Sequence, residues 1–508
     1  MNRRVVLITP YGEENRGIRY ISAVLRAGGF EPHMVFFKRW VNNALTPPTR
    51  REEELLAGLV AEIRPLLVGV GFGAPHFKVV RSLTRRIRTA CDAPILWGGV
   101  FPTVCPEECM EDADAVCIGE GEHVTLDIAR ALADGRPIRD IPGTWVRDRG
   151  EIVRNPVRPL IQDLDSLPFP DYLQADTWFI EGNRKVRTDP ISQTVEYRIY
   201  PTRGCPYTCT YCHAHVMRGI TAAGGGRYYR VRSVKNVIAE LEAAIRILPR
   251  IRRVKFDGDV FAFPSSWIEE LSRTYRERVS IPFEILTYPG ELDAQDYRLL
   301  QQAGLCKVQT GIQSGSQREL LETYHRKSTT QDILDLHRTV LDAGIEVVYD
   351  LIFDNPLATE ADKRSIVELL LKLEHPFSIY MYSLTLFPKT LLARDLIEKG
   401  LATPDDVEGR ATKSYRQFRL SFDWPRSAED RFWIALTSLA SKPFVPKAAI
   451  RRLMESRALR QRPEPLVAAA RLADLAKVGT LALRMLFQGE LTLFKIRQYG
   501  SFKRVISQ

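Results

Sequence analysis

The chain has 508 residues, of which 45% are hydrophobic and 26% charged, so it is a globular protein with room for two or three domains rather than a disordered one. Its formal net charge is +10, but Arg and Lys are scattered among acidic residues as on solvated helix faces, so we expect no nucleic-acid partner. No apolar run approaches the about 18 to 20 residues that cross a bilayer, and the cysteines lack a secreted-type framework, which predicts a cytoplasmic protein without a transmembrane span.

Residues 1–140 alternate short apolar runs with amphipathic segments, which is typical of strands joined by helices. Helical periodicity marks Ile18–Ala27 and Phe77–Thr89. The expected strands are Val5–Pro10, Pro32–Phe37, Leu66–Phe72, Ile95–Gly99 and Ala115–Ile118. Five strands with helical crossovers predict a doubly wound, flavodoxin-like α/β domain.

The loops that follow these strands are the candidate binding sites, because ligands of doubly wound sheets lie beyond the carboxyl ends of the strands. Glycines in such loops let the backbone approach a large flat ligand. The candidate residues are Tyr11, Gly12, Asn15, Arg16, Gly17, Phe72, Gly73, Ala74, Gly98, Gly99, Phe101, Pro102, Thr103, Gly119, Glu120, Gly121 and Glu122.

Residues 141–195 are predicted to be a linker, because Pro and Gly interrupt any long element apart from a hairpin at Thr144–Val153. Strand and helix alternation then resumes over residues 196–400, with helical patterns at Val234–Leu248 and Asp332–Ala343. The expected strands are Tyr197–Pro201, Arg253–Phe256, Phe283–Thr287, Lys307–Ile312, Val347–Phe353 and Ser378–Leu386.

Cys205, Cys209 and Cys212 lie within eight residues, directly beyond the first of these six strands. Three thiolates leave one iron of a cubane iron–sulfur cluster open to bind another molecule. The alternative is a zinc site, for which His213 or His215 could supply the fourth ligand.

The Cys-x3-Cys-x2-Cys spacing resembles the radical S-adenosylmethionine superfamily, in which the open iron binds S-adenosylmethionine. The resemblance implies a partial (β/α)6 barrel over residues 196–400, with chemistry at the C-terminal ends of its strands. It also implies that Tyr211 lies against the adenine. The other cofactor-binding residues implied at the strand ends are Asp257, Asp259, Gln313, Ser314 and Asp350.

Residues 1–140 are similar to the cobalamin-binding domain that precedes the barrel in cobalamin-dependent radical S-adenosylmethionine enzymes. The segments Gly98–Thr103 and Gly119–Glu122 carry most of this likeness. The loop after the first strand lacks the His of an Asp-x-His-x-x-Gly motif, which implies cobalamin with its own base displaced and no His below the cobalt. His76 is the only nearby imidazole, and we expect a loop or surface residue. A flavodoxin-like domain with another ligand or none is the alternative.

The remaining cysteines, Cys91, Cys105, Cys109, Cys117 and Cys306, are expected to be small buried or loop residues. Cys105, Cys109 and Cys117 could in principle hold a second cluster, as in transfer-RNA methylthiotransferases, although their spacing does not match that family. Residues 401–508 are predicted to be helical and basic. Within them, Leu481–Gln508 could lie on a membrane face, but we expect it to pack on the barrel.

The resemblance implies an enzyme that makes a 5′-deoxyadenosyl radical and transfers a methyl group from cobalamin to an unactivated carbon of a small organic metabolite. Its implied cofactors are a [4Fe-4S] cluster, S-adenosylmethionine and cobalamin, and its implied partner is an electron donor such as flavodoxin or ferredoxin. The alternatives are cyclisation, ring contraction or oxidation without methyl transfer, a methylthiotransferase-like enzyme, and a non-catalytic cobalamin-binding regulator.

Overall fold

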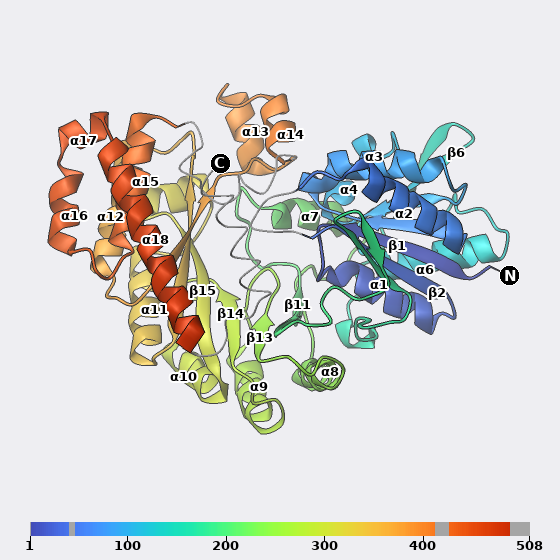
Figure 1. Cartoon of the computed structure of the whole chain (residues 1–508), viewed down its shortest axis with the longest axis horizontal. Helices are drawn as coiled ribbons and strands as arrows, with labels where there is room; N and C mark the ends of the chain where they lie inside the picture. The colour runs from blue at the N-terminus through green and yellow to red at the C-terminus, as the bar shows by residue number, and fades with distance from the viewer. Residues whose placement is uncertain (1, 40–45, 412–425, 488–508) are drawn as a thin grey trace. The chain divides into compact units, whose positions relative to one another are not determined.

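The structure is a computed structural model that describes residues 2–39, 46–411 and 426–487 (Figure 1). These residues form two compact units. The first contains residues 2–39, 46–283 and 385–411, and the second contains residues 284–384 and 426–487. No helix in these ranges has the length and apolar character that a membrane crossing needs.

A nine-stranded sheet forms the N-terminal part of the first unit, with the order β7-β6-β5-β4-β3-β1-β2-β8-β9. Its strands are β1 (Arg4–Pro10), β2 (Glu31–Phe37), β3 (Leu67–Gly71), β4 (Ile95–Gly98), β5 (Ala115–Cys117), β6 (Thr144–Asp148), β7 (Glu151–Arg154), β8 (Thr177–Glu181) and β9 (Arg184–Val186). Strands β1 to β5 pair in parallel. The five predicted strands and the doubly wound sheet are therefore confirmed.

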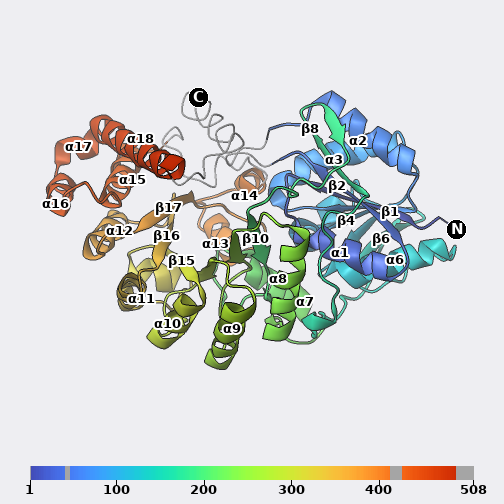
Figure 2. The same ribbon diagram turned by 60° about the horizontal axis from the view of Figure 1, so that its bottom comes forward.

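Helices cover both faces of this sheet (Figures 1 and 2). Alternate residues of β1 point to opposite faces, so Val5 and Leu7 lie in one core cluster and Val6 and Ile8 in another. The first cluster includes residues of α1 (Arg16–Ala27) and α6 (Gly121–Ala133), and the second includes residues of α2 (Arg50–Ile63) and α3 (Phe77–Arg88). Burial on both faces explains why the strands are continuous apolar runs.

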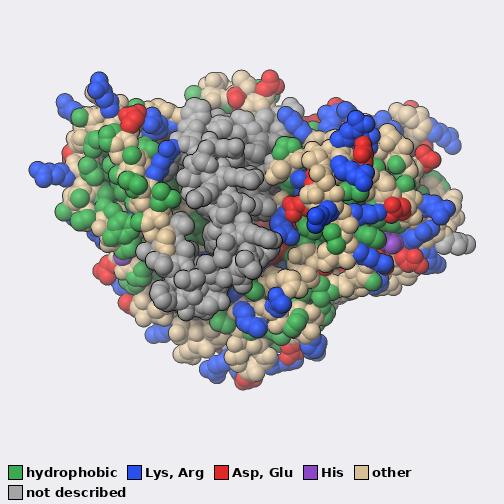
Figure 3. Space-filling model, viewed as in Figure 1, with side chains coloured by type: hydrophobic (Ala, Val, Ile, Leu, Met, Phe, Trp, Pro, Cys, Tyr) green, Lys and Arg blue, Asp and Glu red, His purple; other side chains and the backbone are tan. Residues whose placement is uncertain are grey.

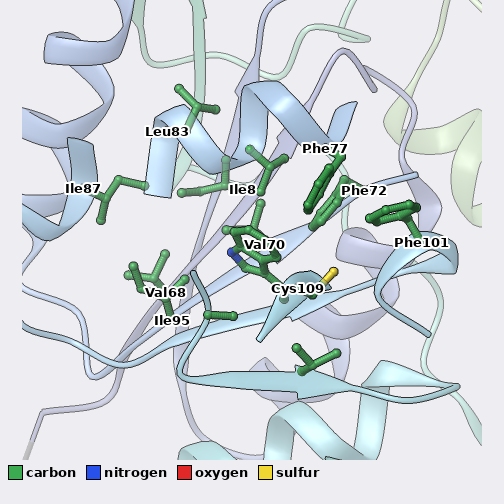
Figure 4. Close-up of a cluster of buried hydrophobic side chains, with 14 of the residues drawn as sticks. Ile8, Val68, Val70, Phe72, Phe77, Leu83, Ile87, Ile95, Phe101 and Cys109 are labelled. Atoms are coloured by element: carbon green, nitrogen blue, oxygen red, sulfur yellow. The ribbon is translucent and has the colours of Figure 1, made fainter. Parts of the chain in front are cut away.

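Aromatic side chains fill the core between the sheet and α3, as the close-up in Figure 4 shows. Trp97 is fully buried and donates its indole N–H to the Thr84 hydroxyl at 3.1 Å. The rings of Phe77 and Phe101 lie 4.7 Å apart, and Phe72 meets Trp97 edge-on at 5.3 Å. Phe72 and Phe101 therefore support the strand-end loops from inside the domain.

The segment predicted as a linker contributes strands to both edges of the nine-stranded sheet. β6 and β7 form an antiparallel hairpin that pairs with β5, which confirms the hairpin expected at Thr144–Val153. β8 pairs in parallel with β2 at the opposite edge, and β9 follows it. The domain boundaries at residues 140 and 195 stay a prediction.

A second sheet has six strands in the order β10-β13-β14-β15-β16-β17. Its strands are β10 (Glu196–Ile199), β13 (Arg253–Phe256), β14 (Phe283–Thr287), β15 (Leu305–Gln313), β16 (Glu346–Phe353) and β17 (Ser378–Ser383). The helices between them are α8 (Val234–Ile247), α9 (Ser265–Arg278), α10 (Ala294–Ala303), α11 (Thr330–Asp342) and α12 (Glu360–Lys372). Strand order follows chain order and the observed pairs are parallel, which agrees with the predicted partial (β/α)6 barrel.

The remaining strands and helices lie beside the loops and in the C-terminal region. They are β11 (Thr202–Arg203), β12 (Arg230–Val231), α4 (Val100–Val104), α5 (Pro106–Cys109), α7 (His213–Ala222), α13 (Leu391–Glu398), α14 (Pro404–Ala411), α15 (Ala428–Ala440), α16 (Lys447–Met454), α17 (Arg457–Gln461) and α18 (Glu464–Phe487). The predicted helical C-terminal segment is confirmed over its described part.

Ion pairs join this C-terminal region to α12 within the second unit. Lys363 contacts Glu429 at 2.8 Å and Asp430 at 2.6 Å, and Arg364 contacts Glu455 at 2.5 Å. The region therefore packs on the outer helix of the barrel. The expectation for Leu481–Gln508 lies outside the residues whose side chains are described.

Lys and Arg side chains over α3 are visible in Figure 3. Arg81 and Arg85 of α3 both pair with Asp112, at 2.6 and 3.0 Å, and Arg88 pairs with Asp114 at 2.9 Å. These positive charges are balanced locally, as expected for a solvated helix face.

Candidate functional site

The three cysteines lie in the loop between β11 and α7. Gly204 before the first cysteine has a φ of +80°, and a Cβ there would lie 2.4 Å from the carbonyl oxygen of Tyr228. Only glycine fits this close approach. Cys212 is the N-cap of α7, and its sulfur accepts a hydrogen bond from the Ala214 N–H at 3.5 Å. A tight glycine turn and a helix cap therefore shape the loop.

The three thiols fit a [4Fe-4S] cluster by the chemistry of the donor set. Burial raises the pKa of Cys205 to about 12, although a hydrogen bond from the Tyr207 backbone acts to lower it. The nearby Cys212 and Cys209 also raise this pKa, so the three thiols influence one another. No group of three or more His, Cys, Asp and Glu side chains in the described residues is arranged around a common metal position. The fit therefore rests on the donor set, since three thiols leave one iron of a cubane open.

His215 ties the cysteine loop to the segment after β17. Its Nε2 accepts a hydrogen bond from the Leu391 N–H at 3.2 Å, so its Nδ1 carries the proton and donates to the Cys209 carbonyl at 3.0 Å. The Leu392 N–H donates to the Thr210 carbonyl at 3.0 Å. Both ring nitrogens of His215 are thus engaged, which leaves neither for the zinc alternative.

His213, the other histidine of that alternative, packs its ring against Phe387 with 4.1 Å between the ring centres. Phe387 precedes Pro388 in the loop after β17, and this loop therefore contacts both histidines that follow the cysteines. Both histidines help to hold the cysteine loop in place.

Asp257 and Asp259 follow β13, as predicted, but their surroundings differ. Asp257 accepts hydrogen bonds from Arg198 and from the Tyr200 hydroxyl, each at 3.3 Å. Burial, and then the Asp257 charge, raises the pKa of Asp259. Asp259 in turn is close enough to raise the pKa of Cys205. Of the two carboxyl groups, Asp259 therefore lies beside the cysteines, where Tyr211 is half-buried.

Gln313 is the last residue of β15, in the second unit, and Ser314 follows it. Gln313 has a φ of +59°, and the Ser314 side chain is fully buried. The Ser314 hydroxyl accepts a hydrogen bond from the Ser316 N–H at 3.0 Å and also bonds to Glu319. Ser314 therefore belongs to a buried network of this unit.

Asp350 lies on β16, also in the second unit. Its two carboxylate oxygens accept hydrogen bonds from the Gln309 amide at 3.1 and 2.9 Å. The side chain is only partly buried, so it remains accessible to a ligand on the polar face of the sheet. As an expected cofactor contact it stays a prediction.

Asn15 and Arg16, predicted to contact a ligand, use their side chains inside the protein. The Asn15 amide caps α1 by accepting from the Ile18 N–H at 3.2 Å. Arg16 lies over the Tyr197 ring at 4.4 Å and pairs with Glu240 at 3.3 Å. The helix cap explains the Asn at position 15, and the ion pair explains the Arg at position 16, without a bound ligand.

Tyr11 and His76 meet at the carboxyl ends of β1 and β3. Their rings are stacked with centres 5.5 Å apart, and the Tyr11 hydroxyl donates to the Thr46 carbonyl at 2.7 Å. His76 lies in a short 3-10 turn, Ala74–His76, and is 9% exposed. The expected loop position is confirmed, and the turn folds the imidazole inward, so the side chain is buried.

The loops Gly98–Thr103 and Gly119–Glu122 lie side by side. The buried Thr103 hydroxyl accepts from the Gly119 N–H at 3.1 Å and donates to the Gly99 carbonyl at 2.8 Å. Gly99 has a φ of +110°, and a Cβ there would lie 2.5 Å from the Phe72 carbonyl. The loop glycines at partly or fully exposed positions are Gly12, Gly17, Gly73, Gly98, Gly99, Gly119 and Gly121, whereas Ala74 and Pro102 are buried.

Glu120 and Glu122 are not free for a ligand in this arrangement. Both carboxylates pair with Arg203, which stands two residues before Cys205. Sequence reasoning missed Arg203 and Arg230, and it considered His215 only as a zinc ligand. The position of Arg203 close to Cys205 was the only feature of the sequence that pointed to a role for either arginine. Ion pairs between distant segments leave no local sequence pattern.

The other cysteines are spread over both units. Cys105, Cys109 and Cys117 are buried as expected, and burial raises the pKa of Cys117 to about 12. Cys109 points into the core cluster of Figure 4. Cys91 is partly buried, whereas Cys306 is exposed at the start of β15, so the expectation of a buried or loop position is wrong for Cys306. The apolar setting of the three buried thiols gives no support to a second cluster.

Two family profiles match separate parts of the chain. The B12 binding domain matches residues 3–129, and the Radical SAM superfamily matches residues 199–370. They fall on the two regions where the sequence predicted them. The predicted cobalamin-binding and radical S-adenosylmethionine domains, with the cofactors that these domains use, are therefore confirmed.

Two relatives differ in the reaction that their names give. The chain is 26% identical over 314 residues to the uncharacterized methyltransferase PH0819 of Pyrococcus horikoshii, with 60% of this chain and 64% of that protein covered. It is 25% identical over 338 residues to the anaerobic magnesium-protoporphyrin IX monomethyl ester cyclase of Rubrivivax gelatinosus, with 65% and 56% covered. The chain thus aligns with less than two thirds of the length of either relative.

A solved structure supports the fold. The radical S-adenosylmethionine methyltransferase TsrM of Kitasatospora setae, with cobalamin and a [4Fe-4S] cluster bound, is similar with a TM-score of 0.63. The match covers 93% of this chain and 100% of TsrM at 19% sequence identity. The order of the two domains and the helical end of the chain agree with this architecture.

Proposed function

Since the chain carries a B12-binding domain followed by a radical SAM domain, we propose that it is a cobalamin-dependent radical S-adenosylmethionine methyltransferase that acts on an unactivated carbon of a small organic metabolite. The observation that carries the proposal is the direct attachment of the cysteine loop to the B12-binding domain. Arg203, two residues before Cys205, is bonded to Glu120 and Glu122 of that domain. A methyl carrier and a radical source need such closeness.

When bound, the cluster with S-adenosylmethionine supplies a 5′-deoxyadenosyl radical, and cobalamin supplies a methyl group. The thiolates of Cys205, Cys209 and Cys212 would hold the cluster, and burial of the first two limits access of water. Tyr211 would lie against the adenine, and Asp259 is the nearby carboxyl group for the amino end of S-adenosylmethionine.

The loops after the first, third and fourth strands would receive the corrin. Glycine at Gly99 is required by the approach of the Phe72 carbonyl, and the neighbouring Gly98 leaves the backbone open. Within the loop Tyr11–Gly17 there is no histidine, so we propose base-displaced cobalamin without a His below the cobalt. The buried His76 is then a packing partner of Tyr11.

We further propose a cytosolic enzyme that takes its electron from a donor such as flavodoxin or ferredoxin. None of the eight cysteines, all of which lie in the described residues, forms a disulfide, which suits a reducing compartment. A low-potential electron is needed because S-adenosylmethionine bound at the open iron is cleaved reductively.

Radical cyclisation without methyl transfer is the second candidate function, because the chain is also similar to a protein named as a magnesium-protoporphyrin IX monomethyl ester cyclase. A regulator without turnover is less favoured, since it would have no use for three cysteines around a reducible cluster. A methylthiotransferase-like enzyme is less favoured because Cys105, Cys109 and Cys117 are buried in apolar surroundings.

The test is anaerobic incubation of the reconstituted protein with a reductant, methyl-labelled S-adenosylmethionine and a panel of candidate metabolites. With the true substrate we expect 5′-deoxyadenosine and S-adenosylhomocysteine in comparable amounts and the methyl label in the product. Formation of 5′-deoxyadenosine with a product of unchanged carbon count would reject methyl transfer and favour the cyclase or oxidase alternative.

A further inference from the structure

Two acidic residues at the start of α6 are paired with two arginines that enclose the cysteine loop. Arg203 of β11 and Arg230 of β12 are antiparallel partners, and all three cysteines lie in the chain between them. Glu120 is the N-cap of α6, and Glu122 lies in its first turn. We call this four-residue group the acid–arginine junction. It connects the base of the cysteine loop to the B12-binding domain.

The junction is bonded at several points. Glu120 Oε1 accepts from Nη1 of both Arg203 and Arg230, each at 2.9 Å, and Glu122 Oε1 accepts from Nη2 of Arg203 at 2.5 Å. Glu120 Oε2 also accepts from the Ile161 N–H at 2.7 Å, while Arg230 donates to the Ile161 carbonyl at 2.8 Å. The Glu120 carboxylate therefore fixes the positions of both arginines and of the backbone at Ile161.

Burial makes these bonds strong and specific. The side chains of Arg230 and Glu122 are 4% and 6% exposed, and that of Glu120 is 16% exposed. Solvent and salt screen such pairs far less than surface pairs. Loss of one carboxylate would leave Arg203 or Arg230 with a poorly compensated buried charge.

Apolar contacts hold the other end of the cysteine loop, where it enters α7. Val216, Met217 and Ile220 of α7 pack against the core cluster of the N-terminal sheet, and α7 contacts α4 (Figure 1). These contacts do not involve the junction. Neutralising Glu120 or Glu122 should therefore leave α7 attached and the protein folded, while the β11–β12 end of the loop becomes looser.

A continuous set of bonds leads from the junction to the expected corrin loop. The Gly119 N–H donates to the Thr103 hydroxyl at 3.1 Å, and that hydroxyl donates to the Gly99 carbonyl at 2.8 Å. Glu120 is the next residue after Gly119 and bonds to Arg203. The loop Gly98–Thr103 and the cysteine loop are thus connected through a few short bonds.

We infer that Glu120 and Glu122 are positioning residues that fix the cysteine loop relative to the B12-binding domain. Loss of their charges should slow the methylation of cobalamin and leave radical formation in place. The inference rests on the proposed function, because it concerns how S-adenosylmethionine reacts at two cofactors. Radical formation needs the cysteine loop and the neighbouring contacts to S-adenosylmethionine, which lie outside the B12-binding domain. Methylation of reduced cobalamin needs the two domains aligned, since a small misplacement of reacting groups is costly.

The experiment uses the full chain with its cluster and cobalamin, in the variants Glu120→Gln, Glu122→Gln and the double variant. No substrate is required. Titanium(III) citrate supplies electrons, and S-adenosylmethionine then reacts in two ways. Attack of cob(I)alamin breaks the sulfur–methyl bond, forms the cobalt–carbon bond and releases S-adenosylhomocysteine, whereas one electron from the cluster breaks the sulfur–C5′ bond to give methionine and, after hydrogen abstraction, 5′-deoxyadenosine.

We expect the ratio of S-adenosylhomocysteine to 5′-deoxyadenosine to fall about tenfold in the double variant, with iron and cobalamin contents unchanged. Hydrogen exchange of residues 202–231 should become faster, and that of β1 should not change. The matched control is Glu62→Gln, which removes an exposed ion pair with Lys185 on the same domain. This control should alter neither the product ratio nor the exchange.

A charge exchange, Glu122→Arg with Arg203→Glu, keeps two acids and two bases in the junction and should restore part of the ratio relative to Arg203→Glu alone. An unchanged product ratio together with unchanged exchange in the double variant would overturn the inference. If the unaltered protein forms 5′-deoxyadenosine but no S-adenosylhomocysteine, the proposed function fails instead. In that case hydrogen exchange alone decides whether the junction fixes the loop.

Discussion

The two sheets of this protein bury their strands in different ways. Six of the seven residues of β1, in the nine-stranded sheet, are buried, whereas all six residues of β17, in the six-stranded sheet, are partly exposed. The six-stranded sheet has a polar side on which Lys307 pairs with Glu284 at 3.0 Å and Gln309 bonds to Asp350. The nine-stranded sheet has helices and apolar clusters on both faces.

The difference decides where each sheet can carry chemistry. A sheet covered on both faces offers a ligand only the loops beyond its strands. A sheet with one polar side also offers side chains along its strands, as in β/α barrels. The six-stranded sheet uses both kinds of position, because the cysteines lie in a loop beyond β10 and Asp350 lies on the strand β16.

The largest expected effect is the loss of the cluster from the loop. Replacing Cys205, Cys209 and Cys212 together by Ala should remove nearly all iron and all cleavage of S-adenosylmethionine, because no other cysteines have ligand spacing. The unaltered protein should hold about four irons per chain after anaerobic reconstitution, measured by iron analysis and absorption spectroscopy.

The control for this change is the triple replacement of Cys105, Cys109 and Cys117 by Ser, which should keep the iron although it loosens the core. A full cluster in the first variant would place the metal on other cysteines. A content near eight irons in the unaltered protein would revive the methylthiotransferase alternative.

A smaller effect is expected from substitutions that compare the burial of side chains in the two sheets. Trp97→Ala, in the core of the nine-stranded sheet, should lower the free energy of unfolding by about 3 to 5 kcal/mol. Tyr382→Ala, on the partly exposed β17, should lower it by about 1 kcal/mol or less. Urea unfolding followed by circular dichroism measures both. Equal losses would show that the six-stranded sheet is packed as tightly on its polar side.

The smallest expected effect is a difference in acid sensitivity that comes from the second unit. Burial acts to raise the pKa of Asp362, but hydrogen bonds from Arg318, Ser316 and Thr359 outweigh it and lower the pKa to about 2. A carboxyl group with a lower pKa in the folded state stabilises it above the unfolded value near 4. That stability is lost as the pH falls from about 4 to about 2.

Asp362→Asn should therefore lower stability at neutral pH and flatten this part of the pH dependence. Urea midpoints from pH 7 down to about 2.5 measure it, with the exposed Asp335→Asn on α11 as the control. The same steep loss below pH 4 in the Asp362 variant would assign the acid sensitivity to other carboxyl groups.

Local patterns predicted the strands and the cysteine loop well. The predicted strand Arg253–Phe256 is β13, and Phe283–Thr287 is β14, because alternating or continuous apolar residues are set by each strand's own burial. Gly99 is required by the close approach of the Phe72 carbonyl, whereas the expected approach of the loop glycines to a ligand stays a prediction. The roles expected for side chains in these loops were harder to predict.

Asn15 shows the reason. A polar residue in a strand-end loop can bind a ligand or cap the next helix, and Asn15 caps α1. Arg16 lies among tyrosines that come from residues more than 150 positions later in the chain, such as Tyr172 and Tyr197. Such contacts depend on how segments come together, so no local window of sequence contains them.

The sequence by itself determined the parallel strands of the two sheets and the single loop with three closely spaced thiols, because these follow from apolar periodicity and from spacing along one segment. Only the tertiary structure decided what holds that loop in place. The partners of Arg203 lie 81 and 83 residues away at Glu122 and Glu120, and the partner of His215 lies 176 residues away at Leu391. Ion pairs and backbone bonds over such separations form only when folding has buried both partners together, since each alone is an ordinary polar residue in water.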